Sequence, residues 1–338
     1  MERFSGTIFG LKRVGKYLTD GDLRKAYAEY KESEETALRL IVNTILAEGW
    51  IITLSNPKTM EELARENGYT DMRLLSDILS VLVGENIVSF VDGKYQIREV
   101  KTTSIRPEDV GSAMTNFYYD CSKYLPEALI GKKVSLNDVP RVVLETVFSS
   151  TLTEKGRGVL LRSFSPKNTK EIGVSAFADV GLPFTLKQID EIFNPERIHI
   201  FLQDLRWFTP LKTILQLLSW DDIFFKLVPD LLGRDLSTGL DLFYGEEIFS
   251  FYHETVDERV KTISDYLKPG GRVVTNDPTL SPGQTVSTPA YVLMQTIDGY
   301  PQPLNRDFIT ETFQKHALTV QTIGDNWIIA GKEGSASG

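Results

Sequence analysis

The stretch that decides the fold is IGVSAFADVGLPFTLKQIDEIFNPERIHIFLQDL, residues 172–205. An apolar run from Ile172 to Phe177 ends at Asp179-Val180-Gly181, and a second apolar run, Ile198 to Leu202, ends at Asp204-Leu205. A helix-competent segment separates the two runs. This order predicts a strand, a tight turn, a helix and a parallel strand with an acid at its end, the opening unit of a nucleotide-binding sheet. An acid at the end of the second strand typically binds ribose hydroxyls.

The turn after the first strand departs from the usual pattern. A turn that cradles a phosphate or a cofactor uses glycines, because the ligand must approach bare backbone and its N–H groups. Here Gly181 is followed by Leu182, Pro183, Phe184 and Thr185. We expect side chains to fill the approach, and Pro183 has no N–H to offer.

The composition limits the classes of protein that fit. A chain of 338 residues is expected to hold two domains, or two domains and a helical connector. With 41% hydrophobic and 25% charged residues it has the composition of an ordinary soluble protein. The formal net charge of -9 argues against broad binding to nucleic acid or to anionic membranes.

Cysteine usage and the apolar runs predict a cytoplasmic protein without a membrane partner. The single cysteine, Cys121, permits no internal disulfide, and no cluster of cysteine and histidine predicts a metal site. Residues 1–21 carry scattered charges and do not form a signal peptide. No apolar run is long enough to cross a bilayer, and residues 334–338, GSASG, are expected to be a flexible tail.

Residues 1–100 predict a winged-helix domain. Glu34–Trp50 has apolar residues at helical spacing, and Thr59-Met60-Glu61-Glu62 is a capping box that opens a short helix. Asp71–Glu85 predicts a third helix, and Ile87–Ile97 alternates around a turn at Asp92-Gly93, which is typical of a hairpin.

The charges of this predicted domain argue against DNA recognition. The helix that would enter the major groove carries Arg73 against Asp71, Asp77 and Glu85, which is the wrong sign for phosphate contact. An interaction or dimerisation module is the favoured interpretation, so we expect a homodimer and no nucleic-acid partner.

Residues 101–170 predict a mostly helical connector between the two domains. Its segment Met114–Leu125 is rich in aromatic residues. These residues could line a substrate pocket, but a helical aromatic stripe is more often core, and the core interpretation is favoured.

Residues 171–333 alternate predicted strands and helices. This pattern favours a doubly wound, mostly parallel α/β sheet that ends in an antiparallel pair. After the opening unit, the predicted strands are Ile223–Val228, Leu240–Ile248, Arg272–Thr275, Leu318–Ile323 and Trp327–Ala330, and the predicted helices are Thr209–Leu218, Thr255–Leu267 and Arg306–His316.

Between Glu34 and Lys332 the chain resembles the winged-helix O-methyltransferase family, class I methyltransferases that bind S-adenosylmethionine on a Rossmann-like sheet. The resemblance depends on the spacing of Asp179-Val180-Gly181 and Asp204-Leu205 and on the turn Leu267-Lys268-Pro269-Gly270-Gly271-Arg272-Val273. The helix and wing pattern of Met60–Tyr95 adds to it.

The resemblance implies a set of cofactor contacts. Asp179 and Gly181 would meet the amino-acid end of S-adenosylmethionine, Asp204 its ribose, and Asp230 with Leu231 its adenine. Asp204 and Asp230 also stand where loop acids cap a following helix. The family has further glycines in the first turn, where this chain has Leu182, Pro183 and Thr185.

The catalytic base implied by the resemblance is a histidine just after the fourth strand. His253-Glu254-Thr255-Val256-Asp257 matches the His-Asp-Trp-Ser-Asp-like stretch that carries it. Counting from Asp241 or Leu267 instead puts Ser250 or Phe249 in the histidine's place, and a serine could not deprotonate a phenol. His253 and Ser250 both stay open for this position.

Glu246 and Glu247 follow a predicted central strand, at the edge where such sheets bind ligands. One of them could be a carboxyl with a raised pKa or a ligand for a cationic group, and a helix cap is the alternative. Glu246 is the second catalytic candidate beside His253.

Together these observations predict an S-adenosylmethionine-dependent methyltransferase that acts on a small-molecule acceptor, most readily at oxygen, with an altered donor-binding loop. Two alternatives stay open. One is a retired homologue that serves as a binding or partner protein, and the other is non-methyl chemistry in the same pocket.

Overall fold

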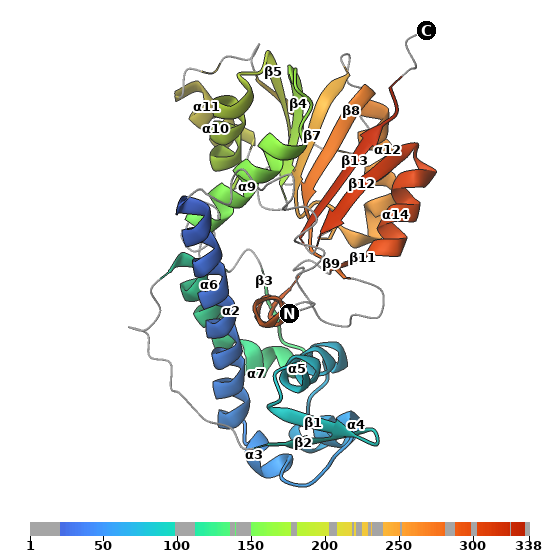
Figure 1. Cartoon of the computed structure of the whole chain (residues 1–338). Helices are drawn as coiled ribbons and strands as arrows, with labels where there is room; N and C mark the ends of the chain where they lie inside the picture. Colours follow the sequence, from blue (N-terminus) through green and yellow to red (C-terminus); the bar gives the residue numbers. More distant parts are fainter. Residues whose placement is uncertain are drawn as a thin grey trace. The chain divides into compact units, whose positions relative to one another are not determined.

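The computed structural model describes residues 21–98, 112–135, 139, 150–176, 181–202, 208–217, 220, 225–228, 231, 239–250, 252–280, 288–298, 303–324 and 326–334. The chain forms two compact units (Figure 1). Lys25–Ser150 and Gln284–Tyr300 make the first, which we call the helical unit, while Thr151–Gly283 and Pro301–Gly338 lie in the second, which we call the sheet unit. In the described ranges no helix is both long enough and apolar enough to span a membrane.

The first half of the helical unit follows the expected order of helices and hairpin. The predicted capping box is present, because Thr59 Oγ1 accepts from the Glu62 N–H at 3.2 Å and Glu62 accepts from the Thr59 N–H at 2.8 Å. The hairpin turns at Asp92 and Gly93, with φ angles of 49° and 77°, as the Asp-Gly pair predicts. The elements are α2 (Gly21–Ala47), α3 (Trp50–Thr53), α4 (Met60–Asn67), α5 (Met72–Gly84), β1 (Val88–Val91) and β2 (Lys94–Ile97).

The aromatic segment contributes to the core of the helical unit, as the favoured interpretation predicts. Phe117 and Tyr118 are buried among the apolar side chains of the neighbouring helices. Gln295, at the end of α13, donates to Asp77 Oδ2 of α5 at 2.7 Å. The remaining elements of this unit are α6 (Ala113–Lys123), α7 (Leu125–Leu129), β3 (Val134–Ser135), α13 (Pro289–Met294) and β10 (Ile297–Asp298).

The sheet unit contains the helices and strands that the sequence predicts from residue 172 onward. The αβ alternation continues from α9 to the final hairpin, and most predicted bounds agree with the observed ones to within a few residues. The exception is β8, which begins at Leu267, so that residues 268–271, predicted as a turn, lie within the strand. The elements are α9 (Thr151–Phe164), β4 (Glu171–Ala176), α10 (Leu182–Phe193), β5 (Arg197–Phe201), α11 (Phe208–Leu217), β6 (Phe225–Val228), β7 (Leu240–Glu246), η7 (His253–Thr255), α12 (Val256–Tyr266), β8 (Leu267–Asn276), β9 (Thr279–Leu280), β11 (Leu304–Asn305), α14 (Arg306–Lys315), β12 (Leu318–Gly324) and β13 (Trp327–Lys332).

Seven strands form the main sheet in the order β12-β13-β8-β7-β4-β5-β6. The pairs β4·β5, β5·β6, β4·β7 and β7·β8 are parallel, while β8·β13 and β12·β13 are antiparallel. The prediction of a doubly wound, mostly parallel sheet with a closing antiparallel pair is confirmed.

The order of the strands marks the ligand-binding edge. From β4 the chain first adds β5 and β6 on one side, and it then crosses to add β7 and β8 on the other. The carboxyl ends of β4 and β7 therefore flank a topological switch point, where open α/β sheets bind their ligands. Ala176 and Glu246 are paired neighbours at this point.

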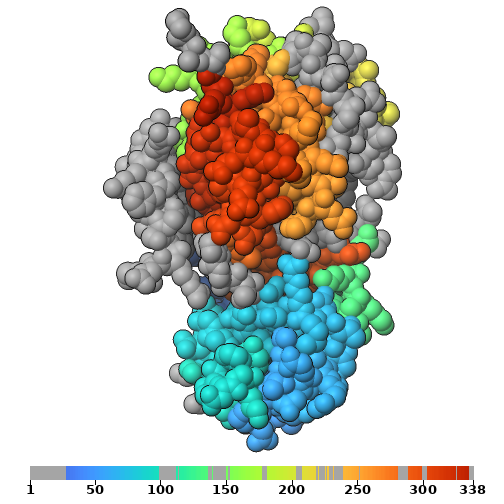
Figure 2. Space-filling view, turned by 90° about the vertical axis from the view of Figure 1, so that its right-hand side faces the viewer, coloured from blue at the N-terminus to red at the C-terminus, as the bar shows by residue number. Residues whose placement is uncertain are grey.

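Each face of the sheet has its own apolar core. Helices α9, α10 and α11 cover one face, and α12 and α14 cover the other (Figure 1). Figure 2 shows the outer surface of the second layer, where α14 and the final strands lie beside α12. From Leu242 onward β7 alternates between the two cores, since Leu242 and Tyr244 lie in the first and Phe243 lies in the second. Leu240 also lies in the second core, because the register of the strand shifts between Leu240 and Leu242.

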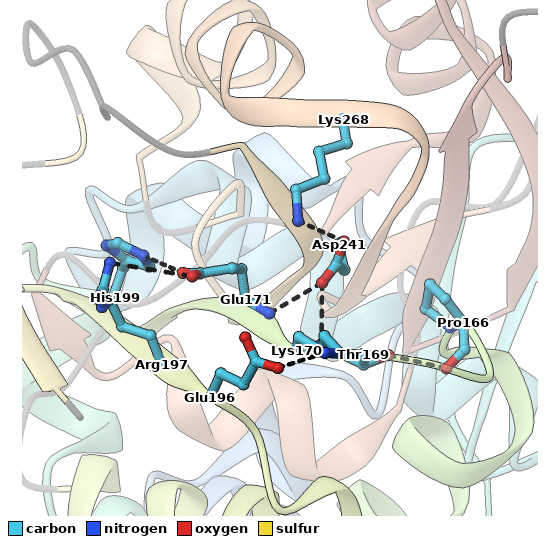
Figure 3. A network of polar contacts seen from close by, with 9 residues as sticks. All are labelled: Pro166, Thr169, Lys170, Glu171, Glu196, Arg197, His199, Asp241 and Lys268. Atoms are coloured by element: carbon cyan, nitrogen blue, oxygen red, sulfur yellow. Dashed lines mark hydrogen bonds and ion pairs between the residues drawn. The ribbon is translucent and has the colours of Figure 1, made fainter. Parts of the chain in front are cut away.

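The amino ends of four strands are tied together by a polar network on the edge opposite the switch point (Figure 3). Asp241 Oδ2 accepts from the N–H groups of Lys170 and Glu171, both at 2.9 Å, and its Oδ1 accepts from Lys268 at 2.8 Å. The Glu171 carboxylate lies 2.8 Å from His199 Nε2 of β5. This network gives the amino edge a structural role and leaves the carboxyl edge for ligands.

Candidate ligand-binding site at the carboxyl edge of the sheet

A buried ion pair lies at the switch point. Arg157 of α9 donates from Nε to Glu246 Oε1 at 2.6 Å, and both residues are 3% exposed. Arg157 comes from the helix that precedes β4, while Glu246 is the last residue of β7. The pair therefore joins α9 directly to the end of β7.

Two further donors converge on the same carboxylate oxygen. Thr185 Oγ1 of α10 and the Tyr244 hydroxyl of β7 each lie 3.2 Å from Glu246 Oε1. Gln188 extends the network, because its side-chain oxygen accepts from Arg157 Nη1 at 3.2 Å. Three elements thus hold Glu246 in one orientation.

The pair leaves one atom of each charge without a partner. Arg157 Nη2 and Glu246 Oε2 are both buried, and neither has a hydrogen-bond partner in the described part of the chain. Such orphaned charged atoms are costly in a protein interior unless a ligand or water completes them. Among the described residues, the pair therefore has one unpartnered cationic atom and one unpartnered anionic atom.

The ionisation of this cluster follows from burial and from the pair itself. Burial lowers the pKa of Arg157, but the neighbouring Glu246 outweighs burial and the pKa is raised overall. Burial, together with Glu246, raises the pKa of the Tyr244 hydroxyl well above its ordinary value of 10.0. Tyr244 is therefore a neutral donor, and Arg157 is a permanent cation.

Glu247 adds a second carboxyl with unusual backbone geometry. Its φ angle is 54°, in the left-handed region that a residue with a side chain seldom adopts, and its N–H donates to Asn276 O at 2.7 Å. Burial, Asp277 and Glu246, in that order, raise its pKa well above the ordinary 4.5. Such a conformation is strained for a residue with a side chain, and strained residues occur more often at functional sites.

Asp277, which follows β8, completes the acidic cluster. It is 0% exposed, and its Oδ1 accepts from the N–H groups of Phe249 and Ser250 at 3.0 and 2.9 Å and from Ser250 Oγ at 2.9 Å. Burial raises its pKa above 3.8 in spite of these donors. Its Oδ2 is buried without a partner among the described residues.

The structure describes Gly181, Leu182 and Thr185 of the turn that follows β4. Gly181 begins α10 with right-handed angles, φ −78° and ψ −21°. Leu182 is fully buried in the apolar core beneath α10, and Thr185 is equally buried against Glu246. Leu182 therefore anchors the helix to the sheet, and Thr185 takes part in the site.

The other predicted cofactor contacts are only partly described. Asp179, Asp204 and Asp230 lie outside the described residues, so their roles stay predictions. Leu231 is fully buried in the core on the α12 face, and its carbonyl accepts from the Tyr266 hydroxyl at 3.3 Å.

The two candidates for the base position lie in different environments. His253 is exposed at the start of η7, where its ring stacks on Phe308 with centroids 5.8 Å apart. Ser250 is 2% exposed and belongs to the Asp277 cluster. Among the described contacts, none brings His253 together with Glu246.

Sequence reasoning missed Arg157, Gln188 and Asp277. Arg157 and Gln188 lie in helices of ordinary amphipathic composition, and no local pattern indicates that their polar ends meet at a strand end. The sequence did contain a signal for Asp277, because it directly follows a predicted parallel strand, and an acid in that position lies at the ligand-binding edge.

Comparison with known proteins identifies the fold. No protein-family profile and no curated protein sequence matches the chain. Among solved structures, the carbon methyltransferase of CurJ is 14% identical with a TM-score of 0.65, over 96% of this chain and 99% of that one. The CMeT domain of the citrinin polyketide synthase is 12% identical with a TM-score of 0.66, over 98% and 95%.

An O-methyltransferase family 2 protein from Planctomyces limnophilus, solved in complex with apigenin, is also similar. It is 14% identical with a TM-score of 0.51, over 89% of this chain and 93% of that one. At these identities the likeness concerns the fold alone. The chain thus has the fold of carbon and O-methyltransferases along nearly its whole length.

Proposed function

We propose that the protein is an S-adenosylmethionine-dependent methyltransferase that acts on a small molecule. The observation that carries this proposal is the Arg157–Glu246 pair at the switch point of a methyltransferase-type sheet. Because a fold does not fix a function, the proposal of a methyl donor is argued from the chemistry of this site.

The residues of the site fit the amino-acid end of the donor. That end is a zwitterion, with a carboxylate and an ammonium group on one carbon. Arg157 Nη2 and Glu246 Oε2 are buried and have no partner among the described residues, and their charges complement those two groups. Gly181, at the start of α10, would stand beside the same end of the donor.

The donor would supply an electrophilic methyl group on a positively charged sulfur, and this chain would supply position. We assign Glu246 a positioning role, because its Oε1 already accepts from Arg157, Thr185 and Tyr244. Asp204 would bind the ribose, and Asp230 with Leu231 would contact the adenine. Holding donor and acceptor in line accounts for most of the rate in such a transfer.

Proton removal from the acceptor is assigned to His253. Its ring is exposed, so an acceptor can reach it, and it lies at the helix start that follows β7. Methyl transfer to oxygen is the first expectation, and transfer to carbon is the second because the similar CurJ structure is a carbon methyltransferase.

A retired homologue is the second candidate function. Ser250, a residue without a basic group, lies in the buried cluster at the strand end, while His253 lies on the surface. If no acceptor is methylated, the same site would bind a ligand without turnover.

A transfer assay separates the two functions. Purified protein is incubated with methyl-labelled S-adenosylmethionine and a panel of phenols, β-keto thioesters and amines, and label in the acceptor is counted. Transfer that disappears in Arg157→Met supports the enzyme. Donor binding without transfer to any acceptor supports the retired homologue.

A further inference from the structure

Two carboxyl groups lie beside the Arg157–Glu246 pair without an ion-pair partner in the described structure. Glu247 and Asp277 follow β7 and β8, which are adjacent and parallel strands. The influences that act on the pKa of Glu247 are burial, Asp277 and Glu246, and all three raise it. Arg157 is paired with Glu246, so this cluster has an excess of acid.

The hydrogen bonds leave the two carboxyls half satisfied. Asp277 Oδ1 receives three donors, whereas Asp277 Oδ2 and Glu247 Oε2 are buried and receive none from the described residues. A hydrogen-bond network built only to hold the loop after β7 would need only Oδ1. These oxygens therefore point to an occupant other than the described residues.

The two residues differ in exposure. Glu247 is partly exposed, although its Oε2 is buried, whereas Asp277 is 0% exposed. The left-handed backbone of Glu247 is fixed by its 2.7 Å hydrogen bond to Asn276 O. A ligand that arrives at the carboxyl edge would meet Glu247 first.

We propose that Glu247 and Asp277 form a subsite for an onium group, a positively charged sulfonium or ammonium, whose binding displaces a proton from the carboxyl pair. Two acids in a dry environment do not both ionise, so the free protein retains a proton there. The bound cation replaces that proton. The O–H bond of Glu247 breaks, the proton passes to the solvent, and no other bond changes.

The charge can come from two sources. One is the sulfonium of the methyl donor, and this possibility rests on the proposed function. The other is a protonated amine on the acceptor. In both cases the affinity for the cation rises with pH, because protons compete with the cation for Glu247. For one displaced proton the affinity rises by up to about tenfold per pH unit.

Calorimetry on the full chain tests the subsite. S-adenosylmethionine is compared with S-adenosylhomocysteine, its neutral thioether counterpart, and n-butylammonium is compared with n-butanol. We expect at least one cation to bind about tenfold more tightly than its neutral partner, and this ratio to fall close to one in Glu247→Gln. Binding of the cation should also release a proton, which appears as different heats in phosphate and Tris buffers.

Three variants make the test specific. Asp277→Asn keeps an oxygen for the N–H groups of Phe249 and Ser250 while removing the charge, and it should also reduce the ratio. Glu311→Gln removes an exposed acid from α14 and should leave the ratio unchanged. If Glu247→Gln does not fold, the test rests on the natural protein alone, through the difference between its heats of cation binding in phosphate and in Tris.

The outcomes separate the subsite from the proposed function. If the protein binds S-adenosylmethionine more tightly than S-adenosylhomocysteine, and Glu247→Gln removes this difference, the sulfonium is the group that the subsite binds. A preference for n-butylammonium alone, with neither adenosyl compound bound, supports the subsite while the methyltransferase proposal fails. No preference for either cation, or equal heats in the two buffers, overturns the subsite.

Discussion

Arg157 in α9 and Glu246 at the end of β7 form a buried ion pair with 2.6 Å between Nε and Oε1. A pair of this kind is rarely a source of net stability, because removing two charges from water costs nearly as much as their attraction returns. The pair lies at the switch point, and each of its residues has one atom without a partner among the described residues, which instead fits a binding site for a ligand with both charges.

Breaking the pair on one side should destabilise the sheet unit. Arg157→Met leaves Glu246 charged and buried, and we expect a loss of about 3–5 kcal/mol in the free energy of unfolding, measured by urea denaturation. The double variant Arg157→Met/Glu246→Met removes both charges and should recover most of the loss. Lys187→Met, which removes one partner of an exposed pair on α10, is the control and should change stability by less than about 0.5 kcal/mol. A double variant no more stable than the single one would contradict this account of the pair.

His253→Ala should slow methyl transfer by about 100-fold or more, because it removes the proposed proton acceptor. Donor affinity should stay unchanged, since the ring contacts Phe308 and has no described contact with the Arg157–Glu246 pair. His316→Ala is the matched control and should leave the rate unchanged. His316 lies at the C-terminal end of α14, where its Nε2 is 2.9 Å from Asp257 Oδ1 of α12. Equal rates for His253→Ala and the natural protein would exclude the histidine as base.

The amino-edge network predicts a pH-dependent contribution to stability. Burial acts to raise the pKa of Asp241, but Lys268 and the N–H groups of Glu171 and Lys170 outweigh it and hold that pKa below 3.8. Since the folded pKa is the lower one, the stabilisation is complete above pH 3.8 and is lost as the pH falls through the folded value.

Asp241→Asn measures this contribution. We expect it to cost about 1–2 kcal/mol at pH 7, a figure kept small because Lys268 is 42% exposed and water screens the ion pair. Melting curves should show the same cost at pH 5 and a smaller one at pH 3. A cost that grows as the solution becomes more acidic would disprove the assignment.

The predicted homodimer should form through the helical unit. Ile52 of α3 is 80% exposed and Val91 at the end of β1 is 66% exposed, and large apolar side chains in such positions favour a partner surface. Light scattering at micromolar concentration should give twice the chain mass, and Ile52→Glu/Val91→Glu should give a monomer. Leu217→Glu, at an equally exposed position in the sheet unit, should leave the dimer intact. A monomer mass for the natural protein would refute the prediction.

Local patterns predicted most of the fold. The Thr59 capping box, the Asp92-Gly93 turn and the opening strand-helix-strand unit are each specified by residues close together in the chain, and all are present. Local patterns do not reveal α13, which lies between Pro278 and Pro303. There Thr288 caps a short apolar turn that is stable only because Ala290, Val292 and Leu293 are buried in the helical unit.

The site was less predictable, because its contacts are not local. Arg157 and Glu246 are 89 positions apart, and no pattern in α9 indicates which polar residue reaches the sheet. The sequence did identify Glu246 and Glu247 as acids at the ligand edge. It could not show that Arg157 neutralises the first while the second has the raised pKa, since that difference depends on tertiary packing.

The most direct test of the central claim is a calorimetric titration of the purified protein with S-adenosylmethionine. The account predicts a dissociation constant in the micromolar range, about −8 kcal/mol, weakened at least tenfold by Arg157→Met and also weakened by Asp204→Ala. Saturating donor should raise the melting temperature in step with that affinity. No heat and no thermal stabilisation at millimolar donor would contradict the claim that this sheet edge binds a methyl donor.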